Sequence, residues 1–83
     1  MIQATPKLTT RELQILGLVA LGYSAKEVAM KCGIGHRTVE VHLDTARLKL
    51  RARNRTHVVA IAIMLGMLSK TDLQLEPDSP LAA

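Results

Sequence analysis

Aromatic side chains are almost absent from this sequence of 83 residues, and Tyr23 is the only one. A hydrophobic core must therefore be built from Leu, Ile, Val, Met and Ala, which suits packed helices better than a β-sandwich. A surface with a single aromatic ring also offers no stacking platform for single-stranded RNA. No stretch alternates apolar and polar residues between turn signals as strands do. These absences favour an all-α protein.

Cysteine occurs only once, at Cys32, so no disulfide can form within the chain. A chain without disulfides fits a reducing compartment, and the apolar helical surroundings of Cys32 predict a small buried hydrophobe. No apolar run approaches the ~20 residues that a membrane span needs. Residues 1–6 also lack the basic start and apolar run of a signal peptide. We therefore expect a cytoplasmic protein.

Groups suited to catalysis or metal binding are also scarce. The three histidines, His36, His42 and His57, have no cysteine or carboxylate partners at zinc-ligand spacing. No nucleophile–base pair and no glycine-rich phosphate loop is recognisable, and a chain of this length has little room for a cleft. We expect no enzymatic activity, no metal and no cofactor.

Charge is distributed unevenly along the chain, whose formal net charge is +4. Residues 7–55 hold ten Lys and Arg against four Asp and Glu, whereas residues 71–83 hold three acids and no base. A basic body favours a polyanion as partner. A solvated basic surface with no such partner is the alternative that a charge of this size also allows.

The length of the chain predicts one domain with one small core, which would gain stability from oligomerisation. Residues 1–7 are expected to form a flexible linker, because Pro6 blocks an earlier helix. Residues 8–68 form the helical domain, and residues 69–83 a flexible acidic tail with two prolines. The chain begins with Met, so both a stand-alone protein and a domain of a longer one are compatible with it.

The first predicted helix begins at a capping box, in which Thr9 and Glu12 bond each other's backbone amides. It runs to about residue 21 and ends at Gly22, which suits the left-handed position after a helix. The residues expected to form its buried stripe, with Ile15 nearby, are Leu13, Leu16, Val19 and Ala20.

Residues 24–50 are typical of a helix-turn-helix. Ser24 and Glu27 form a second capping box, Ala29 allows close approach of another helix, and Gly33 suits the turn. Ile34 would anchor this turn in the core. A longer helix follows from about residue 36 to 50, with an inner stripe of Val39, Leu43, Ala46 and Leu50. The second helix of such a motif enters the DNA major groove, although an αα-hairpin in a small helical domain fits the same pattern.

The last predicted helix begins after Asn54, a fair N-cap, and runs from about residue 55 to 68. Residues 58–65 are continuously apolar, whereas a helix packed on one side shows a polar face. Four of these residues are expected to face the core: Val58, Ile61, Ala62 and Leu65. Three others would remain exposed: Val59, Ile63 and Met67. Because such a patch usually marks an interaction surface, we expect a dimer with an interface of Val58, Val59, Ala62, Ile63 and Met67. A fully buried helix is the alternative.

Several motifs in register carry a resemblance to a known family. They are Leu8-Thr9-x-Arg11-Glu12, Gly22-x-Ser24-x-Lys26-Glu27-Val28-Ala29, Ile34, Thr38-Val39-x-x-His42-Leu43, Lys49-Leu50, Asn54-Arg55-Thr56 and Ala60. The chain resembles the LuxR/FixJ/GerE-type helix-turn-helix domain of bacterial transcription regulators. The resemblance implies four helices in a winged-helix-like domain without a wing, a third helix that reads DNA, and dimers formed largely through the fourth.

The resemblance also implies functional residues. Thr38 and Lys49 would contact or support phosphates, and residues 37, 40, 41 and 44 would face the major groove. There Val41 suits a thymine methyl group, and Arg37 suits phosphate or guanine. The candidate DNA-binding residues are Ser24, Lys26, Arg37, Thr38, Glu40, Val41, Asp44, Arg47 and Lys49.

Two carboxylates depart from the family pattern, because Glu40 and Asp44 stand where basic or polar residues are frequent. They would lower phosphate affinity, or accept a hydrogen bond from cytosine N4. In a third role, each carboxylate would form an ion pair with an arginine at i,i+3 spacing on the same helix, as Arg37–Glu40 and Asp44–Arg47. Of these three roles the sequence favours pairing along the helix, with the cytosine contact second.

The function that we expect is a sequence-specific DNA-binding transcription regulator, working as a homodimer on double-stranded DNA. An upstream regulatory domain or a related regulator would be a further partner. The alternative is a protein–protein module of the same fold, an anti-activator or heterodimer partner with weak or no DNA binding. In that case Glu40 and Asp44 would repel DNA, and the apolar last helix would capture a related regulator.

Overall fold

A computed structural model describes residues 7–68 of the chain. Four helices follow one another: α1 (Thr10–Ala20), α2 (Ala25–Cys32), α3 (His36–Lys49) and α4 (Arg55–Met64). Within residues 7–68 there is no strand, which confirms the predicted all-α, four-helix fold. No helix in this part of the chain has the length and hydropathy to cross a membrane. The predicted acidic tail and all of the predicted linker except Lys7 lie outside the described residues.

The first two helices begin at the predicted capping boxes. At α1, Thr9 Oγ1 accepts a hydrogen bond from the Glu12 amide at 3.1 Å, and Glu12 Oε1 accepts one from the Thr9 amide at 2.8 Å. At α2, Ser24 and Glu27 repeat the arrangement with distances of 3.1 and 2.9 Å. Each box satisfies amides that a helix start leaves without a partner.

The turn between α2 and α3 has the predicted glycine geometry. Gly33 adopts φ +68°, a left-handed conformation that side chains with a Cβ disfavour. Its neighbour Ile34 donates a backbone hydrogen bond to Ala29 at 3.1 Å, which closes the end of α2. Gly35 caps α3 without any side-chain hydrogen bond. The turn sets the direction in which α3 leaves α2.

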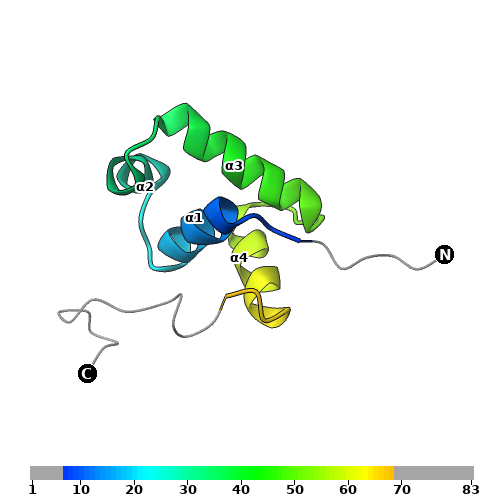
Figure 1. Cartoon of the computed structure of the whole chain (residues 1–83). Coiled ribbons are helices and arrows are strands. Elements are labelled where there is room, and N and C mark those ends of the chain that lie inside the picture. The colour runs from blue at the N-terminus through cyan, green and yellow to red at the C-terminus, as the bar shows by residue number, and fades with distance from the viewer. Residues whose placement is uncertain (1–6, 69–83) are drawn as a thin grey trace, which may run out of the picture.

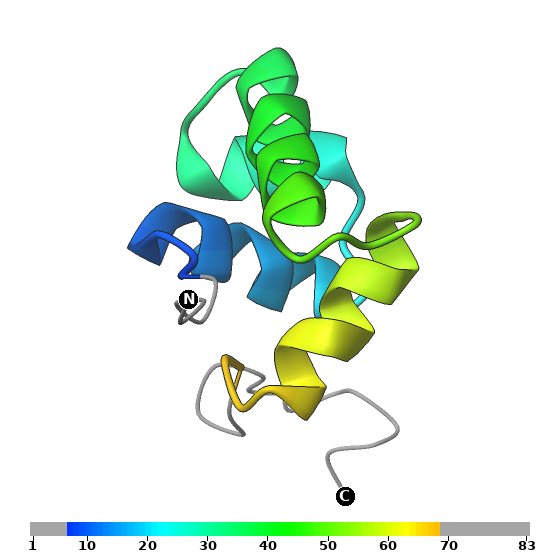
Figure 2. The same cartoon turned by 90° about the vertical axis from the view of Figure 1, so that its right-hand side faces the viewer.

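The core is formed where α1 lies between α3 and α4, with α2 packed against α3 (Figure 1, Figure 2). The predicted inner stripe of α3 is confirmed, because all four of its members are buried: Val39, Leu43, Ala46 and Leu50. The largest fully buried side chains come from all four helices: Ile15, Leu16, Val28, Val39 and Val58. The core is thus aliphatic, as the scarcity of aromatics requires.

The buried face of α1 differs from the prediction. Ile15 is fully buried together with Leu16, whereas Leu13, Val19 and Ala20 are half-buried. The reason is that α1 contacts each of the other three helices, so that its buried face is centred on Ile15 and Leu16. The prediction of one apolar stripe holds for a helix that packs against neighbours on one side only.

Helix α4 is shorter than predicted, because it ends at Met64 and not at residue 68. Gly66 adopts φ +72°, and the Met67 amide then donates to Ala62 O at 2.8 Å. This geometry ends the helix and turns the chain back on itself. Leu68 is consequently buried in the core.

The early end of α4 changes which of its side chains are covered. Val58 and Ala62 are buried as predicted, and Ile61 is half-buried. The prediction that Leu65 faces the core is wrong, since Leu65 follows the last helical residue and is 54% exposed. Two residues expected to be exposed are half-buried instead: Val59 and Met67.

Candidate nucleic-acid interface

Helix α3 lies along one edge of the molecule, with α1 on its inner side (Figure 1). Its buried stripe faces α1 and α2. With 3.6 residues per turn, the opposite side carries Arg37, Val41 and Leu48, and all three are exposed. This outer side is the part of the helix-turn-helix that is available to a groove of DNA.

The candidate residues on α3 divide between this outer side and the flanks. Arg37, Thr38, Val41 and Asp44 are exposed. Glu40 is half-exposed and lies on the flank that faces the start of α4. The outer side therefore holds three of the four positions that the resemblance assigns to the groove.

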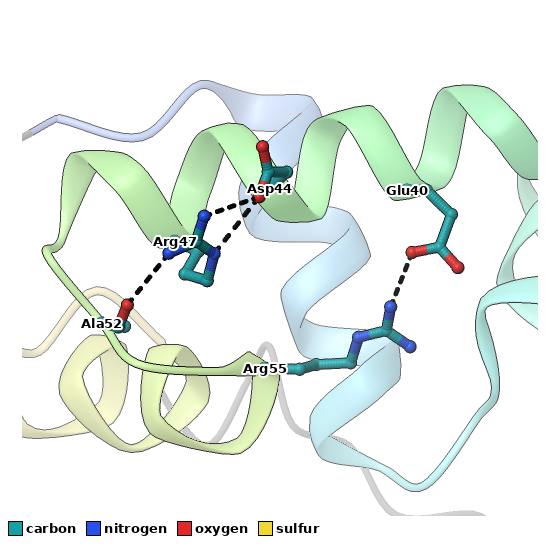
Figure 3. Close-up of polar contacts among 5 residues, drawn as sticks. All are labelled: Glu40, Asp44, Arg47, Ala52 and Arg55. Carbon is teal, nitrogen blue, oxygen red and sulfur yellow. Dashed lines mark hydrogen bonds and ion pairs between the residues drawn. The ribbon is translucent and has the colours of Figure 1, made fainter.

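Glu40 is held by a residue from another helix. Arg55, the first residue of α4, donates from Nη2 to Glu40 Oε2 at 2.6 Å (Figure 3). The other oxygen, Oε1, lies 3.3 Å from His36 Nε2. The predicted pairing of Glu40 with Arg37 is wrong, because Arg55 reaches Glu40 across the contact between α3 and α4.

Asp44 forms the predicted pair with Arg47. Arg47 donates from Nη2 at 2.9 Å and from Nε at 3.2 Å, and both bonds go to Asp44 Oδ1. Arg47 Nη1 also donates to Ala52 O at 3.4 Å, in the connection between α3 and α4 (Figure 3). The arginine is therefore fixed at two points, and it fixes Asp44 in turn.

Lys49 lies on the opposite flank of α3, against α1. Its Nζ donates to Glu12 Oε1 at 2.9 Å and to Lys7 O at 3.4 Å. Burial by itself would raise the pKa of Glu12, but the hydrogen bonds from Lys49 and Thr9 outweigh it and hold that pKa below the ordinary 4.5. In this structure the lysine thus serves the contact between α1 and α3.

The two candidate residues outside α3 lie at the start of α2. Ser24 is exposed, and its hydroxyl accepts the capping hydrogen bond from Glu27. Hydrogen bonds from Ser24 also lower the pKa of the Glu27 carboxyl. Lys26 is exposed. Sequence reasoning missed the contact in which Lys31 Nζ lies 4.4 Å from the centre of the Tyr23 ring, a cation–π geometry.

The connection between α3 and α4 is basic and tightly bound. Arg51 adopts φ +53°, which is uncommon for a residue with a side chain. The Ala52 amide donates to Arg47 O at 2.9 Å, and Ala52 is buried. Arg51 and Arg53 are exposed. This segment thus presents two guanidinium groups beside the C-terminal half of α3.

The residues assigned to a dimer interface are only partly accessible. Val58 and Ala62 are buried in the core of the single chain and offer a partner no surface. Ile63 is 45% exposed, and the sequence reasoning left out its exposed neighbours Met64, at 74%, and Leu65. We name these three residues, Ile63, Met64 and Leu65, the exposed end of α4. The sequence signal that could have identified them is Gly66, because a glycine at this position ends the helix just after these residues.

Comparison with known proteins finds relatives among bacterial regulators. The profile of the family described as bacterial regulatory proteins, luxR family, matches residues 6–62. The transcriptional activator protein BjaR1 of Bradyrhizobium diazoefficiens is 43% identical over 67 residues, covering 76% of this chain and 28% of that protein. The HTH-type transcriptional activator RamA of Corynebacterium glutamicum is 42% identical over 67 residues, covering 81% of this chain and 24% of that protein.

Solved structures share the fold. The transcription factor GerE matches with a TM-score of 0.72 at 32% identity, over 75% of this chain and 92% of that one. The Vibrio cholerae VqmA dimer, described as a LuxR-type receptor that changes conformation in the absence of target DNA, matches with a TM-score of 0.72 at 31% identity. That match covers 88% of this chain and 35% of that one. The chain spans about a quarter of the length of the curated relatives BjaR1 and RamA.

Proposed function

Because the chain belongs to the luxR family of bacterial regulatory proteins, we propose that it is a sequence-specific DNA-binding transcription regulator. Helix α3 would enter the major groove with its outer side. The observation that carries the proposal is the exposure of Arg37 and Val41 on the side of α3 opposite its buried stripe, with Thr38 exposed on the flank. An exposed helix with donor and apolar groups in this order suits the base edges of the groove.

Basic residues around α3 would supply the phosphate contacts. Arg37, Arg51 and Arg53 are exposed and make no ion pair within residues 7–68. Lys26, at the start of α2, is similarly exposed. Each phosphate that such a residue neutralises releases counterions, which makes binding salt-dependent. We expect the protein to act in the cytoplasm, where bacterial DNA lies.

A homodimer is part of the proposal. The exposed end of α4 is apolar and has no cover within residues 7–68. A second copy that docks there would remove the apolar surface from water. Two copies of α3 would then read two half-sites about one helical turn apart.

The test is fluorescence anisotropy of a labelled random-sequence duplex, titrated with the protein at two salt concentrations. We expect binding that weakens steeply between about 50 and 200 mM salt, because several phosphates are contacted. An absence of binding at the lower concentration, from protein whose helical circular dichroism is intact, would overturn the proposal. A selected operator would follow from a positive result.

A second candidate function is a protein–protein module that keeps the fold and binds a related regulator. The observation in its favour is that Glu40 pairs with Arg55 at the start of α4 and Asp44 pairs with Arg47 on α3 itself, so that two arginines near the outer side of α3 are neutralised. Under this alternative the Glu40→Lys, Asp44→Lys double variant would bind duplex DNA and the native chain would not. Salt-dependent binding by the native chain would exclude it.

A further inference from the structure

We infer that Asp44 selects a cytosine in each half-site through its second carboxylate oxygen, and that Glu40 makes no base contact. The inference rests on the proposed DNA-binding function and deepens it. It distinguishes two carboxylates that look equivalent in the sequence, one helical turn apart on α3. The distinction follows from how each carboxylate is held.

Asp44 keeps one oxygen available. Both hydrogen bonds from Arg47 go to Oδ1, and Oδ2 receives none from residues 7–68. The side chain is 61% exposed, and its second oxygen points away from Arg47 in Figure 3. Asp44 also borders the outer surface of α3, together with Arg37, Glu40, Val41 and Thr45. An acceptor is thus presented at the edge of the reading surface.

Arg47 orients this acceptor and offsets its charge. The guanidinium is bound to Ala52 O as well as to Asp44, and Ala52 is buried. A side chain fixed in this way loses less freedom when it contacts a base. The adjacent positive charge also reduces the repulsion that a lone carboxylate would meet from phosphates. Arg47 therefore acts as a positioning residue for Asp44.

Glu40 lacks these properties. Oε2 is bound by Arg55, and Oε1 faces His36. Glu40 borders the same outer surface as Asp44, but each of its oxygens lies beside a nitrogen of Arg55 or His36, whereas Asp44 Oδ2 receives no hydrogen bond from residues 7–68. Its contacts join α3 to the first residue of α4, which is a structural role.

The base follows from the chemistry of the major groove. Cytosine presents the N4 amino group, a donor, whereas guanine presents two acceptors and thymine an acceptor and a methyl group. Adenine presents a donor at N6, but its N7 acceptor lies beside it and repels a carboxylate. An unprotonated Asp44 can only accept, so cytosine is the base that it favours.

The experiment is selection from a randomised duplex pool, followed by competition among the four bases at the selected position. We expect the native chain to enrich cytosine once per half-site and to prefer it about tenfold. Asp44→Asn should shift the preference to adenine, because an amide donates to N7 and accepts from N6. Asp44→Ala should accept all four bases, and Glu40→Gln should keep the preference for cytosine.

Arg47→Gln tests the positioning role. We expect it to weaken the preference for cytosine severalfold without a shift to adenine. An undiminished preference in this variant would contradict the role assigned to Arg47, provided that its circular dichroism matches that of the native chain.

The remaining outcomes distinguish a failure of the proposed DNA-binding function from a failure of the role assigned to Asp44. If no duplex is bound by folded native protein, the proposed function itself fails. If a motif is selected but Asp44→Asn and Asp44→Ala leave it unchanged, only the inference fails. Loss of the preference for cytosine in Glu40→Gln as well would overturn the distinction between the two carboxylates.

Discussion

Glu12 is the one buried charged residue among residues 7–68, with only 4% of its surface exposed. Its carboxylate caps α1 through Thr9 and binds Lys49 of α3. A single side chain therefore joins a local signal for a helix start to a contact between two helices. The capping part follows from a spacing of three residues, whereas Lys49 lies 37 positions away and no local pattern predicts it.

We expect Glu12→Gln to lower the free energy of unfolding by about 1–3 kcal/mol, because a charge-assisted hydrogen bond is lost inside the fold. Urea denaturation followed by circular dichroism measures this. Glu27→Gln is the matched control, since it changes the same kind of capping box at an exposed site where no lysine donates a hydrogen bond to the carboxylate within residues 7–68. Equal losses in the two variants would show that Lys49 adds nothing.

The lowered pKa of Glu12 makes this contribution depend on pH. A carboxyl whose pKa is lower in the folded state stabilises the fold when it is ionised, above its unfolded value, and the stability is lost as pH falls through the folded value. The difference in unfolding free energy between the native chain and Glu12→Gln should be full at pH 7. It should shrink as pH falls below about 4.5, the ordinary pKa of the carboxyl. A constant difference from pH 7 to pH 3 would contradict the role of this ionised group.

The ion-pair partner of Glu40 could not be predicted from the spacing of residues within one helix. Arg37 lies at i,i+3 spacing, and on that basis the pair was expected. The partner is Arg55, which is 15 positions away and is brought near by the packing of α3 on α4. Asp44 and Arg47 pair as expected, because both belong to α3 and their distance is set by the helix itself.

At the scale of the element, helix starts were predictable because their signals are local. The Thr9–Glu12 and Ser24–Glu27 boxes and the Asn54 cap all form as the sequence predicted. The end of α4 was not predicted, because the apolar run concealed the significance of Gly66. The outer side of α3 was predictable in turn, since its buried stripe fixes the opposite side of a regular helix.

The turn between α2 and α3 gives an element-scale prediction. Gly33→Ala should lower the free energy of unfolding by about 1–2 kcal/mol, because its φ of +68° is left-handed. No atom lies within 4 Å of the added Cβ, so a clash makes no contribution. Gly35→Ser is the matched control in the same turn.

Gly35 has φ −72°, which any residue adopts, and a serine there would supply the missing cap of α3. We expect its stability to be unchanged or raised by a few tenths of a kcal/mol. Thermal unfolding compares both variants with the native chain. A Gly33→Ala variant as stable as Gly35→Ser would contradict the requirement for glycine in the turn.

At the scale of the whole molecule, the distribution of apolar residues was predicted only in outline. The aliphatic composition and the continuous apolar run of α4 indicated both a small core and an interaction surface. Whether an apolar side chain of this segment lies in the core or on the surface depends on where the chain turns after Met64. That turn places Leu68 in the core and leaves Leu65 exposed. Tertiary packing decides such assignments, and hydropathy alone does not.

The exposed end of α4 carries the prediction about assembly. Ile63→Lys should weaken self-association at least tenfold in sedimentation velocity, because a charge would be buried in an apolar contact. Met30→Lys is the control, since Met30 is 77% exposed but lies on α2. A monomeric native chain at high concentration, or equal effects of the two variants, would argue against a dimer through this surface.

Three hydrogen bonds hold the connection between α3 and α4. Arg47 Nη1 donates to Ala52 O, the Ala52 amide donates to Arg47 O, and Arg55 donates to Glu40. Each hydrogen bond spans a connection of only a few residues, so α3 and the start of α4 have little freedom to rotate relative to one another. A second copy seated on α4 would inherit this rigidity. The distance between the two α3 helices of a dimer would then be fixed. Inserting base pairs between the half-sites would lower the affinity for DNA, because no flexible hinge could adjust the spacing of the helices.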